Sequence, residues 1–244
     1  MAAFNVSVSK AERLTPNMLR LTFSGDDLKD FPCGQESGYL KLALEEQGRK
    51  RMRSYTIRAF DDVAKELTLD FVDHGDSGPA SRWATRAVVG SSAQLHGPGP
   101  TKLVDMQAPW FFITGDMTAL PAIAVNLEML PQSAVGYAVI EVVSEADKQV
   151  LQHPQGIEVH WVINPTPDRQ NSLLADAVTA LPWCEEDPSV WVACEFEAMR
   201  NIRRYMRQVR EVPKSNLYAS SYWKMQASDE ENKKAKSSDS EAQI

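Results

Sequence analysis

One stretch in the first half of the chain carries polar side chains suited to binding a planar ring. It contains Arg53, Ser54, Tyr55, Thr56 and Arg58, and its composition is typical of a β-strand. The backbone and hydroxyl groups of an extended segment can hydrogen-bond to the pyrimidine edge of a flavin, and a tyrosine can stack on the ring. Taken alone, this pattern is more often that of an ordinary strand with alternating faces.

A second stretch opens a helix predicted over residues 79–88. Its glycines and small side chains leave backbone N–H groups uncovered at the positive end of the helix dipole, which suits the diphosphate of FAD. Taken alone, the stretch is a turn followed by a helix start, with Ser77 as the N-cap. The residues that distinguish it are His74, Gly75, Gly78, Ala80, Ser81 and Trp83.

A third motif lies further along the chain, at residues 115–123, and includes Asp116, Thr118 and Ala119. In this order the three motifs resemble the siderophore-interacting protein family, the FAD-dependent ferric-siderophore reductases of the ferredoxin–NADP reductase superfamily. The resemblance extends over residues 4–223. It implies a flavoprotein enzyme that reduces chelated Fe³⁺ to Fe²⁺, with a ferric siderophore as its substrate.

The resemblance also implies roles for individual residues in binding FAD. The strand residues are expected at the isoalloxazine ring and at the ribityl or phosphate groups, and Ala80 and Ser81 are expected at the diphosphate. The full set of expected cofactor-binding residues is Arg53, Ser54, Tyr55, Thr56, Arg58, His74, Gly75, Gly78, Ala80, Ser81, Trp83, Asp116, Thr118 and Ala119.

A later motif bears on the electron donor, which is expected to be NADH, NADPH or ferredoxin. Trp191, Ala193 and Glu195 match the family, but Cys194 stands where the family commonly has glycine. A glycine there allows close approach of a dinucleotide, so the cysteine leaves the choice of donor open. We place Cys194 and Glu195 on the donor side, and the alternative for Cys194 is a small buried thiol packed behind the sheet.

Four basic residues are candidates for binding the iron chelate, because many ferric siderophores are anions. They are Lys41, Arg51, Lys102 and Lys224. The last follows Tyr222-Trp223, close to a Gly-Tyr-Trp-Arg ending that is common in the family. The alternative for each of them is a solvated surface charge.

Composition narrows the class of protein. A net charge of −7 argues against a nucleic-acid partner and against a general affinity for anionic membranes. The three cysteines (Cys33, Cys184 and Cys194) and four scattered histidines lack the spacing of a metal or iron–sulfur site. No apolar run approaches the roughly 20 residues needed to cross a bilayer, and no secretory signal is evident. We therefore expect a cytoplasmic monomer without membrane insertion or a built-in metal.

The pattern of elements predicts a two-domain β plus α/β protein. Alternating strands in the first half predict an antiparallel FAD-binding β-barrel over residues 1–105. Apolar strands at 110–114, 134–143, 157–162 and 190–194, with helices between them, predict a parallel-sheet NAD(P)H-binding-like α/β domain over residues 106–226. Its last helix, at 197–210, places Met199, Ile202, Met206 and Val209 on one core-facing stripe. The polar tail, 227–244, is expected to be disordered.

Three other interpretations of the same motifs stay open. One is an enzyme of this architecture with another acceptor, such as a flavin reductase or a ferredoxin–NAD(P) reductase. A second is a flavoprotein that binds a ferric siderophore without reducing it. The third is an unrelated barrel-plus-sheet protein in which the motifs coincide by chance, and the agreement of three ordered motifs with the fold pattern argues against it.

Overall fold

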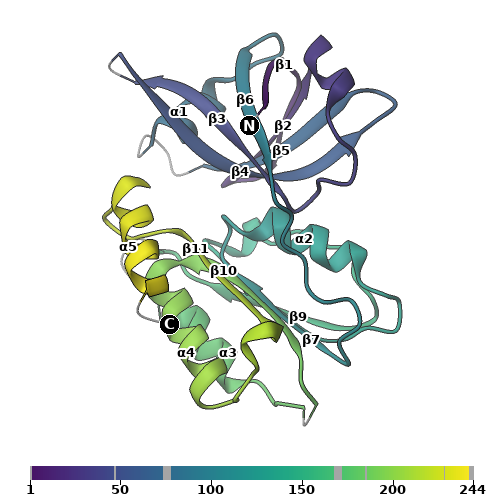
Figure 1. The fold of residues 1–244 in the computed structure, drawn as a ribbon, viewed down its shortest axis with the longest axis vertical. Helices are drawn as coiled ribbons and strands as arrows, with labels where there is room; N and C mark the ends of the chain where they lie inside the picture. The colour runs from purple at the N-terminus through teal and green to yellow at the C-terminus, as the bar shows by residue number, and fades with distance from the viewer. Residues whose placement is uncertain are drawn as a thin grey trace. The chain divides into compact units, whose positions relative to one another are not determined.

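The computed structural model describes residues 2–46, 48–73, 78–167, 172–184, 186–227 and 229–241. The chain forms two compact units (Figure 1). Unit 1 comprises Met1–Leu103 with Ala124–Asn126 and Ala146–Val150, and unit 2 comprises the rest of the chain. The contacts thus divide the main part of the chain after Leu103, near the predicted boundary between residues 105 and 106.

Unit 1 is a closed antiparallel barrel in the order β1-β2-β5-β4-β3-β6, which confirms the predicted barrel. The last strand pairs back onto the first, with Leu95 opposite Phe4. Helix α1 (Pro79–Arg86) follows β5, and a 3₁₀ helix, η1 (Asp26–Asp30), follows β2. The barrel strands are β1 (Ala2–Thr15), β2 (Met18–Ser24), β3 (Tyr39–Glu46), β4 (Arg49–Asp61), β5 (Glu66–Val72) and β6 (Ser92–Gly99).

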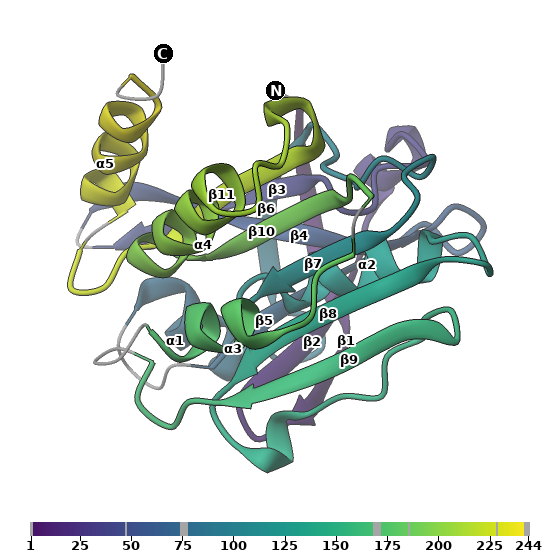
Figure 2. The ribbon, with the colours of Figure 1, turned by 90° about the horizontal axis from the view of Figure 1, so that it is seen from below.

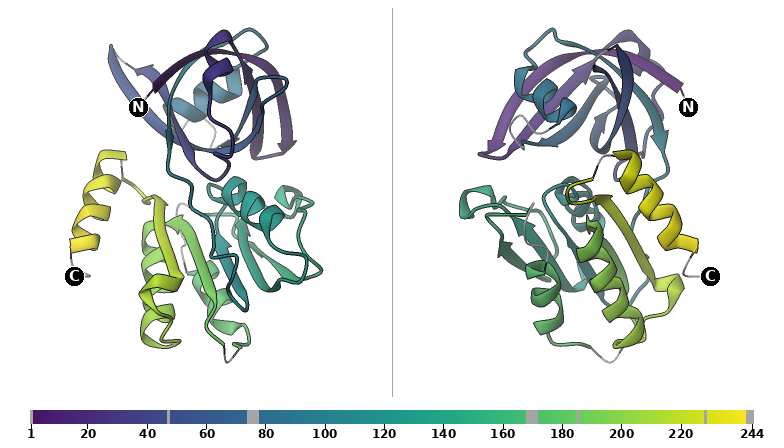
Figure 3. Two further views of the ribbon diagram at one scale, coloured as in Figure 1. Left: turned by 45° about the vertical axis from the view of Figure 1, so that its right-hand side comes forward. Right: turned by 90° about the vertical axis from the view of Figure 1, so that its left-hand side faces the viewer.

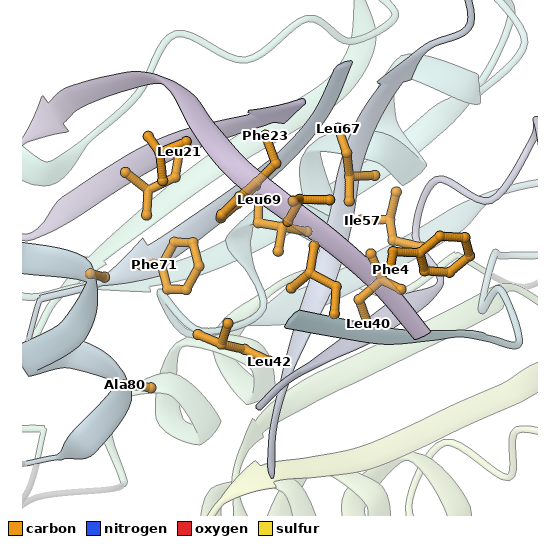
Figure 4. Packing of buried hydrophobic residues seen from close by; sticks show 14 of the residues in the cluster. Phe4, Leu21, Phe23, Leu40, Leu42, Ile57, Leu67, Leu69, Phe71 and Ala80 are labelled. Atoms are coloured by element: carbon orange, nitrogen blue, oxygen red, sulfur yellow. The ribbon is translucent and has the colours of Figure 1, made fainter. Parts of the chain in front are cut away.

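Apolar residues at alternate positions fill the interior of the barrel (Figure 4). Successive side chains of a strand point to opposite faces, so Leu67, Leu69 and Phe71 of β5 all face inward, and all three are fully buried. Full burial of one such side chain contributes about 1.5–3 kcal/mol. Helix α1 adds Ala80 and Ala84 to this core, so packing fixes the helix against the barrel.

Unit 2 contains a five-stranded parallel sheet in the order β11-β10-β7-β8-β9, which confirms the predicted parallel sheet. Its central strand, β7, is buried along its whole length, as expected for a strand covered on both faces. Strand β11 was not predicted, because its serines and half-buried aromatic residues form no apolar run. The strands are β7 (Phe111–Gly115), β8 (Val135–Val142), β9 (Gly156–Ile163), β10 (Ser189–Glu195) and β11 (Leu217–Trp223).

Helices α3 (Leu173–Ala180) and α4 (Phe196–Gln208) cover one face of this sheet (Figure 2). Met199, Ile202 and Met206 of the predicted stripe are buried, but Val209 is 64% exposed. The placement of Val209 was wrong because α4 ends at Gln208 and Val209 is its C-cap. Unit 2 also contains η4 (Lys214–Asn216), α5 (Asp229–Glu241) and both ends of α2 (Leu120–Met129), whose residues Ala124–Asn126 belong to unit 1, and η3 (Glu145–Asp147) follows β8.

Helix α5 lies in the tail that we expected to be disordered, so the structure differs from that expectation. Its contacts with α4 and β11 include one small apolar residue, Ala235, and several polar pairs. Asp239 accepts two hydrogen bonds from Arg203, at 2.6 and 2.8 Å, and Lys236 donates to the carbonyl oxygen of Ser221 at 2.8 Å. Composition alone does not reveal such pairs, because their partners lie far away in the sequence.

Candidate functional site

The residues predicted to hold a flavin ring lie on β4, between β3 and β5. Directly opposite residues of an antiparallel pair share a face of the sheet. Arg53 lies opposite Leu42 and Tyr55 opposite Leu40, so both share the face of these core leucines. The ring of Tyr55 packs against Phe71 with 4.2 Å between centroids. This packing anchors Tyr55, which remains partly exposed.

The alternate residues of β4 face the other way. Ser54 is exposed, whereas Thr56 is only 8% exposed. Arg58 lies where the register between β4 and β5 shifts, between Ile57 and Ala59. Such a bulge redirects a side chain relative to a regular strand. The strand therefore presents hydroxyl and guanidinium groups on more than one side.

An aromatic cluster joins the first two predicted motifs within unit 1. Phe71 packs against Tyr55 of β4 and also lies 6.1 Å from Trp83 of α1, measured between ring centroids. Trp83 in turn stacks on Phe23 of β2, with the rings 6.3 Å apart and 10° from parallel. The two segments that the sequence assigned to one ligand thus lie on adjoining parts of the same barrel.

The N-terminus of α1 has the form expected of a phosphate-binding turn. Gly78 is its N-cap, no side chain in the described part of the chain caps it, and Pro79 occupies the first turn. Among the residues that the structure describes, a Cβ atom at Gly78 would meet nothing within 4 Å. The first N–H groups of a helix point beyond its end, where the helix dipole is positive. Ala80 and Ser81 occupy this turn.

A cavity of about 290 Å³ borders α1 and includes Pro79, Arg82, Trp83 and Arg86 in its lining. Together with the polar side chains of β4 and the uncapped helix end, it offers what FAD requires, namely a polar strand for the ring and cationic and N–H groups for the diphosphate. The residues present in unit 1 therefore fit the cofactor. His74, Gly75 and Ser77 lie outside the described residues.

The third motif lies at the carboxyl edge of the parallel sheet in unit 2, where open α/β sheets bind ligands. The buried carboxylate of Asp116 accepts hydrogen bonds there from Thr118, from the backbone N–H of Glu195 and from Nε1 of Trp223. The distances to Glu195 and Trp223 are 2.9 and 2.7 Å. Asp116 thus ties together the ends of β7, β10 and β11.

Glu195 and Gly115, at the same edge of the sheet, are also held in place by contacts within the chain. Glu195 caps α4 by accepting from the N–H groups of Glu197 and Ala198, and its other oxygen accepts from Met225 N at 3.0 Å. A Cβ atom at Gly115 would lie 2.3 Å from the carbonyl oxygen of Ala193, so only glycine allows β7 and β10 to approach this closely. Cofactor binding by Asp116, Thr118 and Ala119 stays a prediction.

Glu141, on β8, is a buried acid that the sequence did not single out. The residue is only 7% exposed, and Oε2 of its side chain has no hydrogen-bond partner among the described residues. Burial, and then the negative charge of Asp116, raises the pKa of the Glu141 carboxyl from 4.5 to about 7. The one signal in the sequence is a single acid inside the apolar run of residues 138–143.

Cys194 is fully buried among the apolar residues between the sheet and α3 and α4. Burial raises the pKa of its thiol well above the usual range, so the thiol is neutral and packed as a small apolar group. Its placement agrees with the alternative of a packed thiol, and a role for Cys194 or Glu195 toward the donor stays a prediction. Among the described residues, no group of three His, Cys, Asp or Glu side chains is placed to hold a metal ion.

The four basic candidates for the substrate belong to different units. Lys41 lies opposite Ser54 on the outer face of β3 and β4, Arg51 lies on β4, and the exposed Lys102 follows β6. Lys224 belongs to unit 2, where its Nζ lies 4.2 Å from the centroid of the Phe196 ring and 3.8 Å from Glu197. A joint patch of these residues therefore stays a prediction.

Comparison with known proteins identifies the family. The family model "Siderophore-interacting FAD-binding domain" matches residues 7–52 and 42–102, and "Siderophore-interacting protein" matches residues 108–226. Ferric vibriobactin reductase ViuB of Vibrio cholerae is 34% identical over 233 residues, covering 86% of this chain and 85% of that protein. The chain belongs to the siderophore-interacting protein family, and its barrel is the family's FAD-binding domain. This confirms the resemblance inferred from the three motifs.

Solved structures agree with this assignment. The siderophore-interacting protein SipS from Aeromonas hydrophila superposes with a TM-score of 0.86 and 31% identity, covering 96% of each chain. Ferredoxin-NADP+ reductase from Plasmodium falciparum, at 14% identity, has a TM-score of 0.62 and covers 88% of this chain and 93% of that one. The second likeness shows the fold alone and confirms the two-domain architecture. No helix in the described part of the chain is both long and apolar enough to cross a membrane.

Proposed function

We propose that this protein is an FAD-dependent ferric-siderophore reductase that reduces chelated Fe³⁺ to Fe²⁺ and so releases iron in the cytoplasm. The observation that carries the proposal is the aromatic cluster joining β4 and α1 within a barrel that matches the family's FAD-binding domain. Two relatives named for this reaction support it. They are ViuB and the ferric acinetobactin reductase of Acinetobacter baumannii, which is 27% identical over 182 residues, covering 73% of this chain and 62% of that protein.

In this proposal the barrel residues bind and orient the cofactor. Arg53, Tyr55 and Thr56 hold the flavin ring at β4, and Arg58 contacts the ribityl or phosphate groups. The N–H groups of the first turn of α1 hold the diphosphate, helped by the positive end of the helix dipole. The packing of Tyr55 and Trp83 on Phe71 keeps the two parts of the site at a fixed separation.

FAD, when bound, supplies the transfer of electrons from a donor to the iron, and the donor is NADH, NADPH or ferredoxin. Hard anionic oxygens bind Fe³⁺ far more tightly than Fe²⁺. One electron added to the chelate therefore releases the metal, and no covalent bond in the siderophore has to break. The step requires no general base, so the contributions of the protein are binding, orientation and control of access.

The substrate is an anion in this proposal, and the chain has a net charge of −7. Basic side chains must therefore overcome a general repulsion near the flavin. Lys41 is well placed on unit 1, since it shares a sheet face with Ser54 of the flavin-binding strand. Arg51, Lys102 and Lys224 complete the proposed set, and they act by attracting and orienting the chelate.

An anaerobic titration tests the proposal directly. The purified protein is loaded with FAD, reduced by light, and titrated with a ferric siderophore in the presence of a ferrous chelator. We expect the flavin to be reoxidised. The amount of ferrous complex formed should equal the number of electrons that the flavin gives up. A protein that takes up no FAD, or a reduced flavin that ignores every ferric chelate, would contradict the proposal.

The same experiment separates the other functions. Reoxidation by free flavin or ferredoxin, with no response to ferric chelates, would indicate a flavin reductase or a ferredoxin–NAD(P) reductase. Binding of the chelate without reoxidation would indicate a non-catalytic siderophore-binding flavoprotein. Replacing light with NADH, NADPH or reduced ferredoxin in turn then identifies the donor.

A further inference from the structure

Helices α4 and α5 and strand β11 lie close together in unit 2 (Figure 3). A basic cavity of about 640 Å³ is lined by residues of these three elements. Of the described residues, two carboxylates, those of Glu197 and Asp239, line the cavity together with a larger number of cations. Because the chain as a whole has a net charge of −7, the excess of positive charge around one cavity is local. The cations that line it are Arg200, Arg203, Arg204, Arg207, Lys214 and Lys236.

Two of these arginines donate their hydrogen bonds to neutral acceptors among the described residues. Arg204 donates to the side-chain oxygen of Asn201 at 2.9 Å, and Arg207 donates to the carbonyl oxygen of Val212. Both acceptors are neutral, so they orient the guanidinium groups without cancelling their charge. Lys214 lies at the same cavity and is exposed. The cavity therefore retains a positive potential that favours anions.

Asp239 shows how an anion fits this cavity. Its two oxygens each accept from Arg203, and Oδ1 also lies 3.2 Å from Nε of Arg200. A guanidinium group binds the paired oxygens of a carboxylate or phosphate in this forked geometry. One carboxylate from α5 thus pairs with two of the cations, whereas Arg204, Arg207 and Lys214 line the same cavity and can contact a second anion.

The size of the cavity suits a small molecule, since ligand pockets usually measure about 300–1,000 Å³. A single carboxylate would neutralise few of the cations, whereas a ligand with two phosphate groups carries a higher charge in a small volume. We propose that this cavity binds a small molecule carrying two or more phosphate groups, and that Asp239 competes with it for Arg203. The site is separate from the FAD-binding residues of unit 1 and does not depend on the proposed reductase activity.

Titration calorimetry of the FAD-loaded protein with inorganic pyrophosphate tests this inference, with citrate as an anion of comparable charge that lacks phosphorus. We expect pyrophosphate to bind more tightly than citrate, while the flavin absorbance stays unchanged. Reversing Arg204 and Arg207 to glutamate should weaken pyrophosphate binding at least about tenfold. Reversing the exposed Lys29 and Arg49 of unit 1 changes the net charge equally and should leave the affinity within about twofold.

Substitutions of Asp239 test the competition. Asp239→Asn frees Arg203 and should tighten pyrophosphate binding roughly three- to tenfold, whereas Asp239→Glu keeps the charge and should behave like the wild type. Absence of pyrophosphate binding in both the wild type and Asp239→Asn would overturn the site. Equal weakening by the two double reversals would show a general charge effect, and citrate binding as tight as pyrophosphate would overturn the assignment to phosphates.

Discussion

The buried carboxyl of Glu141 should make the stability of unit 2 depend on pH in an unusual direction. Its pKa is raised from 4.5 to about 7, mainly by burial. Between these two values the folded protein binds this proton and the unfolded chain does not. Stability should therefore fall as pH rises through this window and level off above about pH 7. Most carboxyl groups do the opposite, because hydrogen bonds and ion pairs lower their pKa in the folded state.

The size of the effect follows from the difference between the two pKa values. Each pKa unit corresponds to about 1.36 kcal/mol, so keeping Glu141 ionised at pH 8 costs about 3 kcal/mol of folding free energy. Glu141→Gln replaces the carboxyl with a neutral group of nearly the same shape. The variant should match the wild type near pH 4, where both the folded and the unfolded protein hold this proton, and should exceed its free energy of unfolding by about 3 kcal/mol at pH 8. For a chain of this size, the midpoint of thermal unfolding should rise by roughly 6–12 °C.

Urea unfolding followed by tryptophan fluorescence measures this, because five of the six tryptophans, all but Trp83, lie in unit 2. The quantity to compare is the difference between variant and wild type at each pH, which removes the titration of other groups. Glu211→Gln, at an exposed position of the same unit, is the matched control and should show no pH-dependent difference. A constant difference for Glu141→Gln between pH 5 and pH 8 would refute the reasoning.

Three further substitutions test the fold and the proposed site. Gly115→Ala should destabilise unit 2 by about 1–3 kcal/mol in urea unfolding, because its Cβ would lie 2.3 Å from the carbonyl oxygen of Ala193. Gly78→Ala is the control, because a Cβ there meets none of the described residues within 4 Å; it should change stability by less than about 0.5 kcal/mol, and similar effects at both positions would contradict the prediction. Trp83→Ala should weaken FAD binding about tenfold, because α1 loses its contact with Phe71. An unchanged affinity in a flavin fluorescence titration would show that the aromatic cluster does not hold the two parts of the FAD site in place. Reversing Lys102 and Lys224 to glutamate should slow ferric-siderophore reduction while FAD stays bound, and unchanged kinetics at low salt would rule out the basic patch.

Local sequence patterns predict many of the strands and the family of this protein. Each such pattern depends only on residues that are close together in the sequence. Alternation along strands predicted the barrel, and the apolar run at residues 110–114 predicted the central strand of the parallel sheet. The order of three motifs predicted the family, and the matches to its models confirm it. Strand β11 could not be predicted in this way, because an edge strand with serines carries no local signal of its own.

Contacts between residues that are far apart in the sequence became visible only in the tertiary structure. Phe71 joins Tyr55 to Trp83, so it brings the two flavin motifs together. The resemblance to the family implies a cofactor role for Asp116, which stays a prediction. The structure adds that Asp116 accepts hydrogen bonds from Thr118, Glu195 and Trp223. The burial of Glu141 and the docking of α5 through Asp239 likewise depend on partners from other elements. Burial, hydrogen bonding and electrostatic fields arise from such neighbours, and a linear pattern does not contain them.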